Sequence, residues 1–376
     1  MNNLIKEIDK DTPVHYGNGE NIIFRDHLPG VTKGLAVLSE NNKQSRLIPQ
    51  YFYTQDMFDK FPELHNAKPF SYANYKFTEG CIFKCSFCVD SLLDDFEKNE
   101  MDDVIDALKY YNDNGVHHVR FFNNNINFKK SWLIELCNRI VKENIKVKWS
   151  DSANLRVTSQ EMFDAMGESG CIKLWFGTET ISPRILKQIR KEVSVEQMEK
   201  SLQWAHNSGI WNQCNFIVNF PWETDEEHEM LVDFVKRNFH RGILNGFQLN
   251  IFKLFRKTEY YEYPERFNID TGVRKSNRNE NIYTEIGGRD WDTIVSDGKY
   301  RYKNFLKQTD MGNSGVYVAD HMFFSIHDIY DGDKEKIRKF LDYFRTNTPA
   351  PIHPFPVDPG EDIYDEWYEQ NLKLIK

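Results

Sequence analysis

The sequence lacks any apolar run long enough to cross a membrane, and it lacks an excess of basic residues. Of its 376 residues, 57 are Asp or Glu and 48 are Lys or Arg, so the formal net charge is -9 at pH 7. This balance argues against general nucleic-acid binding, which usually needs a basic surface. The first residues are polar and mixed in charge, unlike a secretory signal. We therefore expect a cytoplasmic protein with no membrane partner.

Cysteine is also scarce, and half of the six cysteines lie in one short motif. Cys81, Cys85 and Cys88 form the pattern C-x3-C-x2-C, whereas the other three are scattered. This is no secreted disulfide framework; it indicates a metal site in a reducing compartment. Cysteine thiolates are the usual ligands of iron–sulfur clusters, and three thiolates leave one iron of a four-iron cluster open.

A structural zinc site is the first alternative for this motif. Zinc prefers a fourth tetrahedral ligand at short spacing, but no histidine follows the motif before His117. In that case the chain would be a metal-stabilised binding protein without catalytic activity. Iron and sulfide in the purified protein would distinguish the two interpretations.

Strand-like and helix-like segments alternate between about residues 74 and 255, which predicts parallel strands with helices outside them. Six such repeats predict an α/β fold with a partial (β/α)6 TIM-like barrel, because a closed barrel needs eight. We expect an N-terminal extension at 1–70, the barrel at 71–255 and a substrate-covering region at 256–376. The predicted strands are Tyr75–Thr78, His118–Phe122, Val147–Ser150, Lys173–Gly177, Asn215–Val218 and Phe247–Phe252.

The cysteine motif resembles that of the radical S-adenosylmethionine (SAM) superfamily. Three later segments resemble the barrel of its cobalamin-associated subgroup: Ala153–Arg156, Trp175–Glu179 and Phe216–Glu223. The resemblance implies that the three cysteines hold a 4Fe-4S cluster whose open iron binds SAM. It also implies an enzyme that reductively cleaves SAM to a 5'-deoxyadenosyl radical, which abstracts hydrogen from a substrate.

The resemblance implies further SAM contacts. Phe87 stands where the family places an aromatic contact to adenine. Glu179 can accept hydrogen bonds from the amino or ribose groups of SAM, and Arg156 can pair with its carboxylate. These two residues are our candidates for the catalytic site, against the alternatives of a structural salt bridge and a surface arginine.

Four asparagines are weaker candidates for cofactor binding. Asn124 or Asn125 could meet the methionine amine of SAM, although an asparagine-rich turn explains them equally well. Asn154 belongs to the first of the three family-like segments. Asn219 replaces a glycine of the family pattern, as Trp222 replaces a second one, so the adenine contact there is in doubt.

The reaction is less constrained than the cofactor. A methylthiotransferase would need three further cysteines, but no cysteine precedes Cys81. About 70 residues precede the barrel, too few for a cobalamin domain, so a cobalamin-type methyltransferase is the alternative to an enzyme that uses the radical directly. The expected outcomes are epimerisation, cyclisation, rearrangement or C–C bond formation. The expected partners are a small metabolite, natural product or peptide as substrate and an electron donor such as flavodoxin or ferredoxin.

Overall fold

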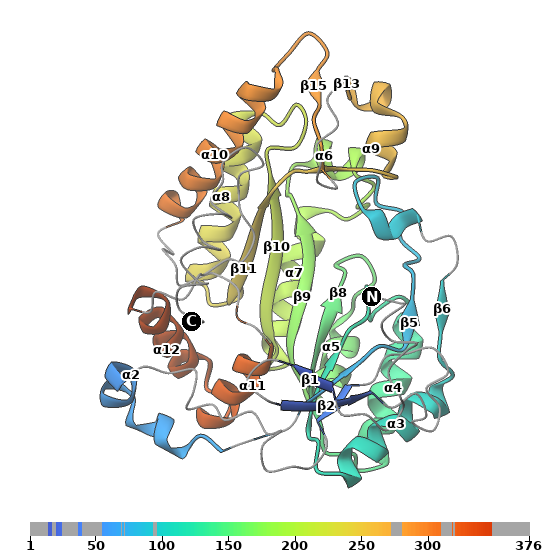
Figure 1. Cartoon of the computed structure of the whole chain (residues 1–376), viewed down its shortest axis with the longest axis vertical. Coiled ribbons are helices and arrows are strands. Elements are labelled where there is room, and N and C mark those ends of the chain that lie inside the picture. The colour runs from blue at the N-terminus through green and yellow to red at the C-terminus, as the bar shows by residue number, and fades with distance from the viewer. Residues whose placement is uncertain are drawn as a thin grey trace.

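A nine-stranded sheet forms the centre of the computed structural model (Figure 1). The structure describes residues 14–16, 20–24, 37–39, 55–68, 70, 72–92, 96–271, 280–309, 318 and 320–347. The strand order of the nine-stranded sheet is β1-β2-β3-β4-β7-β8-β9-β10-β11, and its last six strands run parallel. These six are β4 (Tyr72–Tyr75), β7 (His118–Phe121), β8 (Lys148–Ala153), β9 (Cys171–Glu179), β10 (Trp211–Val218) and β11 (Gly246–Ile251).

The strand-and-helix alternation confirms the predicted α/β partial barrel. A helix follows each parallel strand up to β10 and packs on one face of the sheet, the outer face. Caps fix three helix starts: Ser159 and Ser194 accept backbone hydrogen bonds, and Thr224 forms a capping box with Glu227. The outer helices are α3 (Met101–Asp113), α4 (Lys130–Lys142), α5 (Gln160–Glu168), α6 (Pro183–Gln188), α7 (Val195–Asn207) and α8 (Asp225–His240).

The first predicted strand, at 75–78, is wrong in its position, since β4 spans 72–75. The Asn123 side chain explains the difference. Its Oδ1 accepts hydrogen bonds from the backbone nitrogens of Phe77 and Thr78, at 3.1 and 3.0 Å, so these donors leave the sheet ladder. Thr78 then starts β5 (Thr78–Glu79), which pairs with β6 (Glu97–Lys98) instead.

The flanking segments add to the barrel at both ends. β1 (Val14–Tyr16), β2 (Glu20–Phe24) and β3 (Val37–Ser39) extend the sheet as an antiparallel edge beside β4. Within the described residues, no helix has the length and apolar character needed to cross a membrane. The remaining elements are α2 (Gln55–Lys60), η2 (Pro62–Asn66), η3 (Val89–Leu92), β12 (Leu254–Phe255), α9 (Glu259–Glu262), η4 (Pro264–Phe267), β13 (Ile269–Asp270), β14 (Glu280–Asn281), β15 (Thr284–Glu285), α10 (Trp291–Gln308), α11 (Asp320–Ile329) and α12 (Lys334–Asn347).

Helix α11 closes the inner face of the sheet near the amino-terminal ends of its strands (Figure 1). Asp320 at its start is 2% exposed and pairs with Lys173 of β9 at 3.1 Å and with Arg120 of β7 at 3.0 Å. The indole nitrogen of Trp175 donates to the same carboxylate at 3.3 Å. A buried carboxylate needs such partners to offset its loss of hydration. These four residues form the floor of the barrel interior.

We expect acid to loosen this closure through His327 of α11. Burial, and then the charge of Lys148, lowers the pKa of His327 to about 4. Because the folded-state pKa lies below the usual 6.5, the neutral imidazole stabilises the fold above pH 6.5, and this stability is lost as the pH falls toward 4. The free energy of unfolding of the wild type should fall by about 2 kcal/mol between pH 7 and 5 because of this histidine. In denaturant unfolding, the stability of His327→Gln should fall by less over that pH range. An equal fall in the wild type and the variant would contradict the role of His327.

Candidate active site

The three cysteines lie in a loop that follows β5, and all three are half-buried and outside any disulfide. Ser86, in the middle of this loop, holds it in place. Its backbone nitrogen donates to the Ile189 carbonyl at 3.3 Å and its hydroxyl to the Gln188 carbonyl at 3.0 Å. Its own carbonyl accepts from the Glu259 nitrogen at 3.0 Å. The cysteine loop is therefore fixed between the end of α6 and the start of α9 in the region that follows the barrel.

The cysteine loop suits a cluster better than a single ion. Burial raises the pKa of Cys81, and raises that of Cys88 to about 12, so a metal must supply the charge that stabilises their thiolates. Among the described residues, no three His, Cys, Asp or Glu side chains gather as ligands of one ion. In a four-iron cluster each thiolate ligates a different iron, so three cysteines spread along one loop fit that group.

Glu179, at the end of β9, forms an ion pair at the carboxyl ends of the strands. Its carboxylate lies 3.1 Å from the Lys191 ammonium, which also donates to the Gly177 carbonyl at 2.7 Å. A Cβ at Gly177 would lie 2.7 Å from the Glu179 carboxylate and 2.9 Å from that ammonium, so only glycine leaves room. Arg156 binds the Lys191 carbonyl and lies over Phe83 of the cysteine loop, and Ser86 of that loop binds the Ile189 carbonyl, so the pair lies beside the cysteine loop.

Lys191 was not among the residues predicted from the sequence. It follows α6 in a turn where Arg190 and Glu192 both have positive φ, of 57° and 40°. No motif marks it, because its position depends on the tether between Ser86 and Ile189. Its exposure is 8%, so the ammonium is held close to the cysteine loop rather than in solvent.

Arg156 reaches the same place from the loop after β8. Its Nε donates to the Lys191 carbonyl, and its guanidinium lies 4.9 Å from the centre of the Phe83 ring in the cysteine loop. Its Nη2 is buried without a hydrogen-bond partner among the described residues. A buried guanidinium nitrogen left unpaired suits a carboxylate ligand.

The predicted asparagines separate into different roles. The side chain of Asn154 forms hydrogen bonds within the protein. Its Oδ1 accepts from the Arg156 backbone nitrogen at 2.7 Å, and its Nδ2 donates to Asn125 Oδ1 at 3.0 Å. Asn125 keeps a buried Nδ2 without a partner in the described part of the chain. Asn124 is half-buried beside it. Their contacts to SAM stay predictions.

The family model described as the radical SAM superfamily matches residues 75–235. This region is a radical SAM domain. Radical SAM domains are enzymatic and use a 4Fe-4S cluster and SAM, so the match confirms the predicted family, enzyme class and cofactors for this region.

Two curated relatives of this radical SAM domain are named as methyltransferases. The chain is 31% identical over 165 residues to the uncharacterized methyltransferase PH0819 of Pyrococcus horikoshii. It is 27% identical over 168 residues to the bacteriochlorophyllide d C-12(1)-methyltransferase of Chlorobaculum tepidum. Each match covers 43% of this chain and 36% of the relative, so the chain spans about a third of their length.

A solved structure supports the fold of the radical SAM domain. The methyltransferase TsrM from Kitasatospora setae, with cobalamin and a [4Fe-4S] cluster bound, aligns with a TM-score of 0.52 at 15% identity. The alignment covers 71% of this chain and 60% of TsrM. At this identity the likeness shows a shared fold and no more.

Two residues of the radical SAM domain that replace glycines of the family pattern adopt a backbone conformation that glycine favours. Asn219 and Trp222 have φ of 63° and 62°, a left-handed conformation that is unusual for a bulky residue. Their side chains bind the C-terminal region: Asn219 donates to the Ile294 carbonyl at 2.8 Å, and Trp222 to the Asn268 carbonyl at 3.1 Å. The side-chain oxygen of Asn219 accepts from Arg289 at 2.8 Å. A role of Asn219 in cofactor binding stays a prediction.

Phe87 packs at the edge of the same region. Its ring lies 6.1 Å from that of Phe220, edge to face, and it contacts the apolar cluster that holds Phe252 and Tyr260. This arrangement leaves the predicted adenine contact of Phe87 untested.

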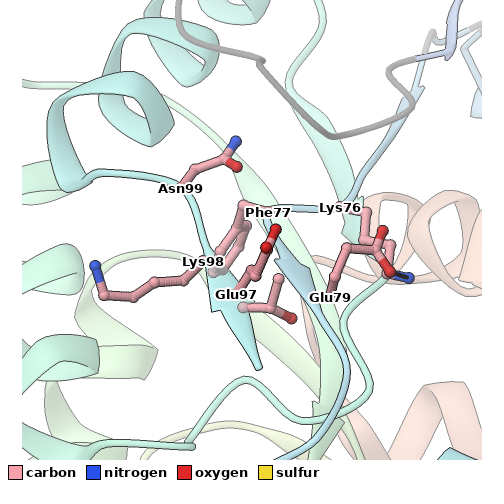
Figure 2. A pocket seen from close by; sticks show the side chains of 7 residues that line it. Lys76, Phe77, Glu79, Glu97, Lys98 and Asn99 are labelled. Atoms are coloured by element: carbon pink, nitrogen blue, oxygen red, sulfur yellow. Dashed lines mark hydrogen bonds and ion pairs between the residues drawn. The ribbon is translucent and has the colours of Figure 1, made fainter. Parts of the chain in front are cut away.

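A pocket of about 270 Å³ lies beside β5 and β6, away from these residues (Figure 2). Lys76 and Glu79 form an ion pair of 2.7 Å at its wall. None of its lining residues belongs to the cysteine loop or to the Glu179–Lys191 pair, so we assign no cofactor to it. The lining residues are Lys76, Phe77, Thr78, Glu79, Glu97, Lys98 and Asn99.

Proposed function

We propose that Cys81, Cys85 and Cys88 hold the 4Fe-4S cluster and that the Glu179–Lys191 pair binds SAM beside it. The observation that carries this proposal is the set of contacts that holds the Glu179–Lys191 pair beside the cysteine loop: Arg156 joins the Lys191 carbonyl to Phe83, and Ser86 binds Ile189. When bound, the cluster and SAM supply an electron and a 5'-deoxyadenosyl radical for hydrogen abstraction.

The residues around the cysteine loop provide positions for each part of SAM. Lys191 and the unpaired Nη2 of Arg156 offer positive charge to the carboxylate. Glu179 offers acceptors to the amino or ribose groups. Phe87 offers an aromatic edge for adenine. We extend the proposal to the C-terminal region 256–376 as the cover of the site, since α9 binds the cysteine loop directly.

We propose that the substrate is a small molecule or peptide from which the radical abstracts hydrogen. Methyl transfer is the second candidate, favoured by the names of the curated relatives. The test is anaerobic reconstitution with iron and sulfide, followed by dithionite and SAM with and without cobalamin. Formation of 5'-deoxyadenosine without cobalamin supports the first candidate. S-adenosylhomocysteine formed only with cobalamin supports the second, and an intact cluster that leaves SAM unbound contradicts both.

Gly177→Ala is expected to weaken SAM binding about tenfold. The new methyl group would lie under 3 Å from Glu179 and Lys191 and separate their charges. A tenfold change corresponds to about 1.4 kcal/mol, in the range of one charge-assisted hydrogen bond. Both displaced groups are ends of flexible side chains, so the melting temperature should stay within a few degrees. Equilibrium dialysis of SAM against the reconstituted variant measures the effect; unchanged affinity would refute the role of the pair.

A further inference from the structure

Four amide side chains line the inner face of the sheet on two neighbouring strands. We call them the amide row: Gln213 and Asn215 of β10, and Gln248 and Asn250 of β11. Asn215 stands opposite Gln248 in the register of the two strands. Since side chains alternate between faces, the residues between them point outward. These outward residues belong to the helix-covered core: Cys214, Phe216, Phe247 and Leu249.

Two members of the amide row have unpaired atoms in their side-chain amides. Gln213 is 0% exposed, and among the described residues neither atom of its amide has a hydrogen-bond partner. The same holds for the side-chain oxygen of Asn215. The neighbour Asn212 faces the other way and donates to the carbonyls of Leu202 at 2.7 Å and Ile243 at 2.9 Å. Buried unpaired amides are costly, so their presence calls for a ligand.

The amide row lies between the proposed SAM site and the floor of the barrel. Asn215 pairs in register with Gly177, whose carbonyl binds Lys191, and Gln213 pairs with Trp175, which belongs to the floor. Strands β9, β10 and β11 run side by side in Figure 1. A molecule bound along the amide row would therefore reach toward the reactive end of SAM.

The chemistry of the amide row selects an uncharged ligand. Each amide offers one acceptor and two donors, which suits hydroxyl groups that both donate and accept. The charged residues Lys173 and Arg120 of this face pair with Asp320. Lys173 lies two residues below Trp175, or about 7 Å along the strand. An anion at the amide row would lose its hydration without gaining a counter-ion.

Resting on the proposed function, we propose that the amide row binds the substrate of the radical SAM domain, and that the bound part is uncharged and rich in hydroxyl groups, as in a sugar or polyol. The substrate then lies over the half-buried Asn215, Gln248 and Asn250. Asn215 is the specificity-determining residue, because its unpaired oxygen belongs to a half-buried side chain, whereas Gln213 is fully enclosed.

The first test needs neither cluster nor substrate. Gln213→Met and Asn215→Leu keep side-chain size and remove the unpaired amides, so their melting temperatures should hold or rise. Asn212→Leu is the matched control on the outer face of the same strand, and its melting temperature should fall because two buried carbonyls lose their donors. If the melting temperatures of Gln213→Met and Asn215→Leu fall as far as that of the control, the amides support the fold and the proposal is wrong.

The second test uses stated probes on the reconstituted holoprotein with SAM. Binding of myo-inositol and N-acetylglucosamine is compared with that of gluconate and glucose 6-phosphate by isothermal titration. We expect the neutral probes to bind and Asn215→Leu to weaken their binding at least tenfold. Absence of neutral binding, a preference for the anions or an unaltered variant would overturn the proposal. Failure to assemble a cluster or bind SAM refutes the proposed function instead, and the melting temperatures still decide the amide row.

Discussion

Replacing Cys85 with alanine is expected to reduce 5'-deoxyadenosine formation to background. Only three cysteines lie in the loop, and each would ligate a different iron, so no described side chain is placed to substitute for a lost ligand. The variant should also lose most of its iron and sulfide after reconstitution. Chromatography of the dithionite-reduced reaction with SAM measures the activity, and iron and sulfide assays measure the cluster.

Cys137→Ala is the control for this substitution. Cys137 is buried in α4 within the main apolar core, and burial raises the pKa of its thiol to about 12. It should keep its cluster and its SAM cleavage, while losing some stability from the small cavity. Equal loss of iron in both variants would mean that cysteine removal acts through folding, and the assignment of Cys85 would lose its support.

The barrel could be predicted because its physical signal is local. β9 and β10 place apolar residues at alternate positions toward the helices, among them Leu174, Phe176, Cys214 and Phe216, and Ser159, Ser194 and Thr224 mark the helix starts. The cysteine spacing likewise needs no tertiary information. Both the fold class and the cofactors are thus contained in short stretches of sequence.

Other parts of the site depend on contacts between distant segments, which spacing does not reveal. Lys191 meets Glu179 only because Ser86 holds the turn after α6 against the cysteine loop. Asp320 joins the floor from 145 residues after Trp175. The sequence predicted Asn124 or Asn125 as the SAM contact in the asparagine run, and it did not indicate that the Asn123 side chain holds the chain before the cysteine loop by hydrogen bonds.

Asn123→Ala is expected to destabilise the protein by about 3 kcal/mol or more and to impair cluster assembly. Asn123 Oδ1 accepts from the backbone nitrogens of Phe77 and Thr78 and from the Thr78 hydroxyl at 2.9 Å, just before the cysteine loop. Its Nδ2 donates to the buried carboxylate of Asp151 at 2.8 Å. Each buried donor left unpaired costs about 1–3 kcal/mol, and Asp151 would lose a partner as well. Denaturant unfolding and iron content after reconstitution measure the two effects.

Asn124→Ala separates this positioning role from SAM binding. Asn124 is half-buried next to Asn123, so its loss should change stability by less than about 0.5 kcal/mol and leave the iron content unaltered. If Asn124 contacts the methionine amine of SAM, the same variant should also bind SAM more weakly while its cluster stays intact. An Asn123→Ala protein with normal stability and a full cluster would contradict the argument, because the chain leading into the cysteine loop would then not need this side chain to hold its path.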